Sequence, residues 1–163
     1  ECSAHSTGRQ AELPRPKKRA GRAARRHREV WMLVALSRDG RVLLERRPTQ
    51  GIWGGLWSLP EFESETAATG WARSALRGGP VALPEWSPRR LGTLEHAFTH
   101  FDLTIQPLVA DCAGAREDAA AVAEAPARRW CLPRDWREGR EPLGLPAPVR
   151  ALLEAVAAEA AQS

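Results

Sequence analysis

The chain of 163 residues has no tyrosine, one methionine and only three cysteines. An odd number of widely spaced cysteines excludes the disulfide framework of a small secreted domain and predicts a protein of a reducing compartment. No apolar run approaches the roughly 20 residues that cross a bilayer, and the N-terminal end does not resemble a signal peptide. These absences favour a cytoplasmic protein with no membrane partner.

The length predicts one folded domain with a tail, which is enough chain to bury a core of useful size. Seven tryptophans and three phenylalanines supply the aromatic surface, and hydrophobic residues make up 43% of the chain. This composition is typical of a soluble globular domain in which large indoles do much of the packing. We expect a single monomeric module or a fragment of a longer protein.

Positive charge is concentrated at the N-terminal end. Residues 1–28 contain nine of the 24 Lys and Arg but only two of the 20 Asp and Glu, so residues 29–163 carry 15 basic and 18 acidic side chains. Pro14–Arg28 has no acid and almost no apolar side chain, so it cannot bury enough surface to become ordered. We therefore expect a disordered basic tail over residues 1–28 and a folded domain over residues 29–163.

The sequence of the basic tail supports two interpretations about equally. It can serve only as a solubilising linker. Alternatively, its side chains neutralise phosphates and release counterions, which gives salt-sensitive, sequence-independent attraction to DNA. The residues expected to contact phosphates in that case are Lys17, Lys18, Arg19, Arg22, Arg25 and Arg26.

Strand patterns follow the tail. Val30–Leu36 is a continuous apolar run, Ser37–Gly40 supplies turn residues, and Arg41–Arg46 follows as a second strand, which together predict a hairpin. Glycines then mark an ordered loop over residues 51–55. The large apolar side chains of this loop and its flank must pack against the domain: Ile52, Trp53, Leu56 and Trp57.

A second hairpin is predicted by Leu91–Ala97 and Phe101–Ala110, joined across the triplet Phe98-Thr99-His100, with Leu103, Ile105 and Leu108 facing the core. The rest of the chain after it is expected to alternate between loops and one short strand. These segments are Asp111–Pro126 as a surface loop, Ala127–Cys131 as a strand, and Pro133–Gly144 as irregular structure or one helical turn.

Two helices are expected. Glu65–Leu76 places small and apolar residues at helical spacing and is followed by the stop signal Gly78-Gly79-Pro80. Pro148–Ala160 has a similar apolar face. The residues on these faces are Ala68, Trp71, Ala72 and Ala75 in the first helix and Val149, Leu152, Leu153 and Val156 in the second. The order of elements predicts an α+β fold, a mixed β-sheet packed between helices.

Two motifs of the chain resemble one family, and they occur in the family's order. Gly51–Phe62 has the sequence G-I-W-G-G-L-W-S-L-P-E-F, and Leu94–Leu103 has the sequence L-E-H-A-F-T-H-F-D-L. Together they resemble the C-terminal domain of adenine DNA glycosylases of the MutY type. The resemblance runs from Cys2 to Leu153 and implies a catalytically silent domain with a Nudix-like fold.

The resemblance also implies a function in base excision repair. The domain would recognise 8-oxoguanine in double-stranded DNA, while the glycosylase domain of the same polypeptide flips and removes the mispaired adenine as an N-glycosyl hydrolase. The chain itself would contain no catalytic residue, and the protein would associate with the nucleoid.

The resemblance assigns lesion recognition to the triplet. Oxidation of guanine adds a carbonyl at C8 and turns N7 into a donor, and the Thr99 hydroxyl can accept from N7–H while donating toward O8. His100 would support the loop or reach the DNA backbone, and Phe98 would anchor the tip or stack near the lesion strand. The expected DNA-contacting or scaffold residues are Phe98, Thr99, His100, Arg46, Arg47, Gly54 and Gly55.

The segment around Cys2 resembles the end of the family's iron-sulfur loop, whose cysteines are spaced C-x6-C-x2-C-x5-C. Cys2 would be the fourth ligand of a [4Fe-4S] cluster in the full-length protein. The other three thiolates would lie upstream of Glu1, so this chain alone is expected to hold no cofactor.

Two other functions stay open. A stand-alone Nudix-like nucleotide-binding protein or hydrolase would need the helix pattern R-E-x-x-E-E to hold divalent metal. The chain has no Glu-Glu pair, and its first helix offers Arg73 and Ser74, followed by Arg77, which disfavours hydrolysis. The second is a generic DNA-binding module that acts through the basic tail, in which Thr99 and His100 are ordinary turn residues. His96 and His100 flank a turn without a third ligand, so no metal site is expected there.

Overall fold

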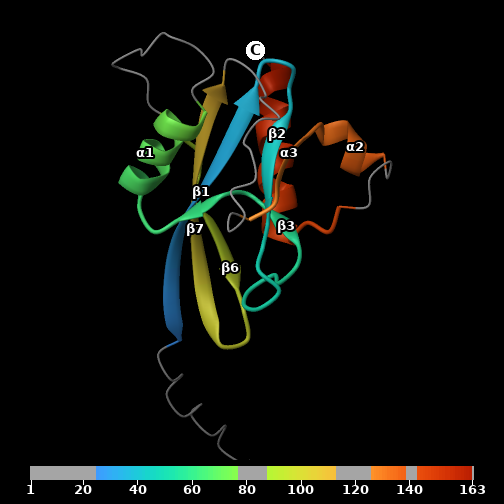
Figure 1. The fold of residues 1–163 in the computed structure, drawn as a ribbon. Coiled ribbons are helices and arrows are strands. Elements are labelled where there is room, and N and C mark those ends of the chain that lie inside the picture. The colour runs from blue at the N-terminus through green and yellow to red at the C-terminus, as the bar shows by residue number, and fades with distance from the viewer. Residues whose placement is uncertain (1–24, 77–87, 113–125, 139–142, 163) are drawn as a thin grey trace, which may run out of the picture.

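The computed structural model describes residues 25–76, 88–112, 126–138 and 143–162. Within these residues eight strands form one mixed sheet, the two longer helices pack on it and the short helix lies to one side, which confirms the expected α+β class (Figure 1). The elements are β1 (Arg26–Ser37), β2 (Val42–Arg46), β3 (Trp57–Ser58), β4 (Glu61–Phe62), α1 (Glu65–Ala75), β5 (Arg89–Arg90), β6 (Leu94–Ala97), β7 (Phe101–Cys112), β8 (Arg128–Cys131), α2 (Pro133–Arg137) and α3 (Ala147–Gln162).

The centre of the sheet is a long parallel pair. β1 and β7 run side by side over their full lengths, from the rung Arg26 with Phe101 to the rung Ser37 with Cys112. The strand order is β3-β2-β1-β7-β5, with β4 paired to β1, β6 to β7 and β8 to β2. Because both faces of this central pair are covered, the apolar run in β1 is continuous rather than alternating.

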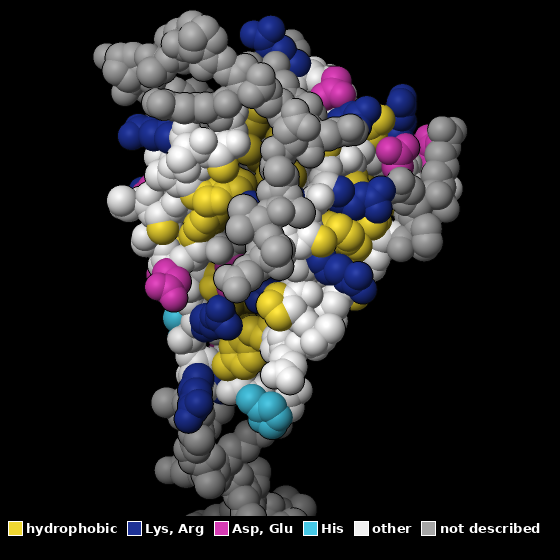
Figure 2. Space-filling view, in the orientation of Figure 1, with side chains coloured by type: hydrophobic (Ala, Val, Ile, Leu, Met, Phe, Trp, Pro, Cys, Tyr) yellow, Lys and Arg dark blue, Asp and Glu magenta, His cyan; other side chains and the backbone are white. Residues whose placement is uncertain are grey.

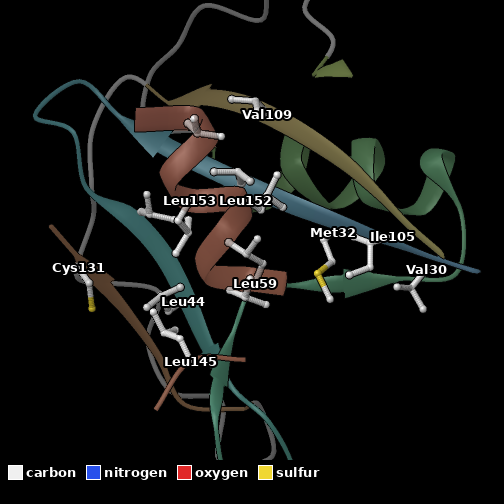
Figure 3. Close-up of a cluster of buried hydrophobic side chains, with 14 of the residues drawn as sticks. Val30, Met32, Leu44, Leu59, Ile105, Val109, Cys131, Leu145, Leu152 and Leu153 are labelled. Carbon is white, nitrogen blue, oxygen red and sulfur yellow. The ribbon is translucent and has the colours of Figure 1, made fainter. Parts of the chain in front are cut away.

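The core has two sides, one for each large helix. Side chains alternate between the faces of a strand, so Met32 of β1 joins the cluster under α3, whereas Leu33 joins the cluster under α1. Figure 3 shows Leu152 and Leu153 of α3 lying over the strands of the first cluster. On the other side α1 contributes alanines, whose small side chains allow the helix to approach the sheet closely.

Both helices form where the sequence predicts them. Ser64 caps α1 by accepting a hydrogen bond from the Ala67 amide at 3.1 Å, which satisfies one of the free donors of the first turn. The four apolar residues expected on the face of α3 are all buried, as are two of the four expected on α1, while Ala75 is exposed. No helix in the described ranges is long and apolar enough to span a membrane.

Several boundaries differ from the sequence-based expectation. The tail was expected to be disordered through Arg28, which is wrong for residues 26–28, because their backbone forms the first rungs of the ladder with β7. Their side chains are exposed, so no apolar pattern marks the strand. Asp111 and Cys112 belong to β7 rather than to a surface loop. The two-residue strands β3, β4 and β5 were not foreseen.

Some expectations fall on residues that are not described. They are the disordered tail over residues 1–24, the helix stop at residues 78–80, most of the loop expected over residues 111–126, and residues 139–142 of the irregular segment before α3. The expected strand before α2 is confirmed as β8, and α2 is the single helical turn expected after it.

One end of the sheet extends beyond the helices. In Figure 1 the first halves of β1 and β7, together with β6, project below the level of α1 and α3. The turn between β6 and β7 therefore lies at the far end of the molecule. We call this part, residues 25–29 with residues 94–105, the ribbon.

Candidate functional site

The tip of the ribbon is a tight turn that exposes two polar side chains. The Phe98 amide donates to the Phe101 carbonyl at 2.8 Å, which leaves Thr99 and His100 as the residues of the turn. Both are exposed, and within the described part of the chain neither side chain has a hydrogen-bond partner. The turn therefore presents a hydroxyl and an imidazole that are available to a ligand.

An aromatic cluster lies directly beneath the tip. Phe98 stacks on Phe101 with ring centroids 4.5 Å apart and meets the His96 ring edge to face at 4.6 Å. Trp53 approaches from the glycine-rich loop, 5.7 Å from Phe98 and 6.1 Å from His96. Aromatic pairs of this kind contribute about 0.5–1.5 kcal/mol each beyond their buried area. The turn thus rests on packed rings.

The glycine-rich loop, residues 51–55, has backbone conformations that few types of residue adopt. Trp53 has a φ of 56°, which is rare for a residue with a large side chain and marks local strain. Gly51 and Gly55 also have positive φ, and Gly54 packs so closely on the Thr49 carbonyl that a Cβ would lie 2.2 Å from its oxygen. The loop closes on itself through a hydrogen bond from the Gly55 amide to the Pro48 carbonyl at 3.1 Å. This conformation directs Trp53 toward the ribbon.

A charged cluster fastens the loop to the sheet. Glu61 of β4 accepts from Arg47 at 2.7 Å on one carboxylate oxygen and from Arg28 of β1 at 2.8 Å on the other. Arg47 also donates through Nε to the Ile52 carbonyl at 3.1 Å. Glu61 and Arg47 are largely buried, with side-chain exposures of 16% and 19%. These hydrogen bonds to Glu61 and Ile52 fix the Arg47 side chain, which therefore acts as a scaffold residue of the loop.

The other basic residues of this end differ in their contacts. Arg46 is exposed and reaches the Gly55 carbonyl at 3.4 Å. Arg25, expected as a phosphate contact of the tail, pairs with Asp102 at 3.2 Å and donates to the Phe98 carbonyl at 3.3 Å. Arg26 is exposed on β1. Figure 2 shows basic and histidine side chains beside exposed hydrophobic ones at this narrow end.

The structure brings most of the expected site together. The triplet, the glycine-rich loop and the arginines at its base meet at one end of the molecule, although their segments are separated in the sequence. The expected residues Cys2, Lys17, Lys18, Arg19 and Arg22 lie outside the described residues. Sequence reasoning missed the partners that hold the site, which are Arg28, Glu61, His96 and Phe101. The sequence shows the spacing of His96 from His100, but no local pattern predicts that the His96 ring packs against Phe98.

The helix α1 has few side chains that could bind a metal ion. Glu65 is the only acid in α1, and both of its oxygens accept from Arg90, whose hydrogen bonds lower the pKa of that carboxyl. In the ranges that the structure describes, no three His, Cys, Asp or Glu side chains are grouped so as to hold a metal. The two described cysteines are also unsuitable, since both are buried and burial raises the pKa of the Cys112 thiol to about 11.

Known structures share this fold. The C-terminal domain of mouse MUTYH, solved in complex with human PCNA, is similar with a TM-score of 0.55 and 19% identity over 80% of this chain and 88% of that chain. The MutT protein of Methanosarcina mazei Go1 is similar with a TM-score of 0.59 and 18% identity over 83% and 96% of the two chains. The NUDIX domain of Shewanella oneidensis NrtR, solved with ADP ribose, is similar with a TM-score of 0.55 and 16% identity over 87% and 94%.

At these identities the structural similarity establishes the fold alone. The family relationship comes from the sequence, since the family model described as NUDIX domain matches residues 31–155, which span both motifs, all of α1 and the first part of α3. The chain therefore belongs to the NUDIX domain family.

Proposed function

We propose that this domain recognises 8-oxoguanine in double-stranded DNA as the lesion-recognition part of an adenine DNA glycosylase. The observation that carries the proposal is the exposed, unpaired Thr99 hydroxyl at the tip of a ribbon that aromatic rings and arginines hold in place. The two motifs at residues 51–62 and 94–103, which resemble the MutY-type domain, favour this function among those that the fold allows.

Thr99 has the chemistry that the lesion requires. In 8-oxoguanine N7 carries a hydrogen and C8 carries a carbonyl oxygen, whereas in guanine N7 is an acceptor and C8 carries no oxygen. A hydroxyl accepts from the new N7–H and donates to O8, but it makes at most one bond to guanine. A paired contact of this kind discriminates between bases by about 1–3 kcal/mol.

The remaining parts of the proposal concern a longer protein. The excision of adenine would belong to a glycosylase domain of the same polypeptide, and the basic residues 17–22 together with Arg26 would add sequence-independent attraction to DNA. A [4Fe-4S] cluster needs four thiolates. Cys112 and Cys131 are buried in the domain, so Cys2 would contribute one ligand only beside an upstream domain that supplies the others.

A Nudix hydrolase is the second candidate, because several similar structures carry that description. Cleavage of a diphosphate linkage in that family uses several carboxylates on one helix to hold divalent metal. Here α1 carries Glu65 alone, and Arg73 and Ser74 follow where acids would be needed. This candidate is tested by incubating the protein with nucleoside triphosphates and Mg²⁺ and measuring the nucleoside mono- or diphosphate formed. We expect no turnover.

The main test compares binding to two duplexes that differ only at the lesion. We expect the 163-residue chain to bind a duplex with 8-oxoguanine opposite adenine more tightly than one with guanine opposite adenine, as measured by NMR titration at low salt. Thr99→Val keeps the shape and the β-branched stiffness but removes the hydroxyl. It should reduce the preference by about fivefold to a hundredfold, which corresponds to the loss of one paired contact.

The control is Thr66→Val, the same change at an exposed position of α1 away from the ribbon. It should leave the preference unchanged. An equal preference in wild-type protein and Thr99→Val would contradict the assigned role of the hydroxyl, and turnover of nucleotides would favour the hydrolase instead.

A further inference from the structure

The turn at the tip of the ribbon lacks the features that stabilise such a turn by itself. Hairpins with a two-residue loop favour type I′ or II′ turns, in which the first loop residue has positive φ, because only these match the twist of the strands. Among the described non-glycine residues only Trp53 has positive φ, so neither Thr99 nor His100 has this conformation. The conformation of the tip therefore depends on contacts from outside the turn.

The Phe98 carbonyl identifies one of these contacts. In a closed two-residue hairpin this oxygen would accept from the Phe101 amide, but in the described structure only the opposite bond, from the Phe98 amide to the Phe101 carbonyl, is formed. The Phe98 carbonyl instead accepts from Nη2 of Arg25 at 3.3 Å. A side chain from the residue before β1 thus takes the place of a backbone bond of the turn.

The same guanidinium also holds the other side of the turn. Nη1 of Arg25 pairs with Oδ1 of Asp102, the second residue of β7, at 3.2 Å. Arg25 stands directly before β1, whose first rung joins Arg26 to Phe101, so the ladder places the guanidinium beside the turn. The planar fork of arginine reaches both acceptors at once, which a lysine ammonium on its flexible stem does poorly.

We propose that Arg25 is a positioning residue that fixes the orientation of Thr99 and His100 for lesion recognition. The guanidinium joins the residue before the turn to the residue after it and supplies the support that the turn residues do not supply themselves. This inference deepens the proposed function and rests on it. It also separates Arg25 from its neighbours in the basic segment, since a phosphate contact would strengthen binding to every duplex equally.

The experiment compares Arg25→Gln with Arg26→Gln. Both variants remove one positive charge at adjacent positions, but Arg26 is exposed and its side chain makes no hydrogen bond or ion pair with the tip among the described residues. The first readout needs no DNA. Amide hydrogen exchange at Phe98, whose amide makes the described backbone bond of the turn, should become faster in Arg25→Gln and stay as in wild type in Arg26→Gln.

The second readout is the ratio of affinities for the 8-oxoguanine and guanine duplexes, measured over a series of salt concentrations. Arg25→Gln should lower this ratio about three- to tenfold, as expected when one hydrogen-bonded charge is lost from a partly exposed site. Arg26→Gln should leave the ratio unchanged, weaken binding to both duplexes and reduce the salt slope. Arg25→Lys keeps the charge and should resemble Arg25→Gln in the ratio, and Asp102→Asn should shift it in the same direction.

The outcomes separate the two proposals. If wild-type protein shows no preference for the lesion, lesion recognition fails, and amide exchange alone then decides whether Arg25 holds the tip. If Arg25→Gln and Arg26→Gln behave alike in both readouts, Arg25 is not a positioning residue. An equal loss of affinity for both duplexes in Arg25→Gln, with normal exchange at the tip, would make it a phosphate contact.

Discussion

Gly54 allows a quantitative test of the loop that carries Trp53. An alanine there would place its Cβ 2.2 Å from the Thr49 carbonyl oxygen and 2.8 Å from the carbonyl carbon. Both atoms are backbone, so relief requires a shift of the chain. Such a shift strains the packing by about 1–3 kcal/mol and weakens the nearby bond from the Gly55 amide to the Pro48 carbonyl, worth about 1 kcal/mol. We expect Gly54→Ala to lower the free energy of unfolding by about 3 kcal/mol.

The assay is urea unfolding followed by tryptophan fluorescence, with thermal unfolding as a second measure. For a chain of this size a loss of this order lowers the melting temperature by roughly 6–12 °C. The matched control is Gly70→Ala within α1, where a Cβ meets no atom within 4 Å. It should stabilise the protein by about 0.5–1 kcal/mol through helix propensity. A Gly54→Ala protein as stable as wild type would refute the close contact that this reasoning uses.

Two further predictions concern buried groups. Glu61→Gln removes the charge that Arg28 and Arg47 both contact and should lower the free energy of unfolding in urea by about 1–3 kcal/mol. The control Glu63→Gln, at an exposed position, should leave it almost unchanged. Equal effects of the two changes would contradict the role of the cluster. Cys112 should resist iodoacetamide at pH 8, because burial raises the pKa of its thiol to about 11 and leaves a thiolate fraction on the order of 10⁻³. Peptide mass spectrometry should find it alkylated only after unfolding, and fast alkylation of native protein would show that the strand end opens.

Local patterns were sufficient for much of the fold. The apolar run of Val30–Leu36 and the turn after it predicted the first hairpin, and helical spacing predicted α1 and the buried face of α3. The triplet at residues 98–100 was placed correctly at a hairpin tip, because two strand patterns flank it. Each of these inferences uses residues close together in the sequence, where side-chain periodicity and turn chemistry act directly.

The contacts that build the site left no such pattern. Residues 26–28 are charged and exposed, and they form a strand only because β7 offers its edge to them. The double contact of Glu61 with Arg28 and Arg47 joins three separate segments. The positive φ of Trp53 contradicts the preference of its side chain and is maintained by the surrounding loop. Tertiary contacts decide all three features, so the sequence predicted the tip of the ribbon but not what holds it.

The parallel pairing of β1 with β7 has a consequence for folding. It brings Arg25 against Asp102, a residue 77 positions further along the chain. Closing so long a loop costs entropy before any contact offsets it, and chains with many non-local pairings fold slowly. The tip should therefore reach its final geometry late, after the central strands have joined. A peptide of residues 94–103 would carry the motif without this support, since the recognition surface is a discontinuous determinant assembled by the whole sheet.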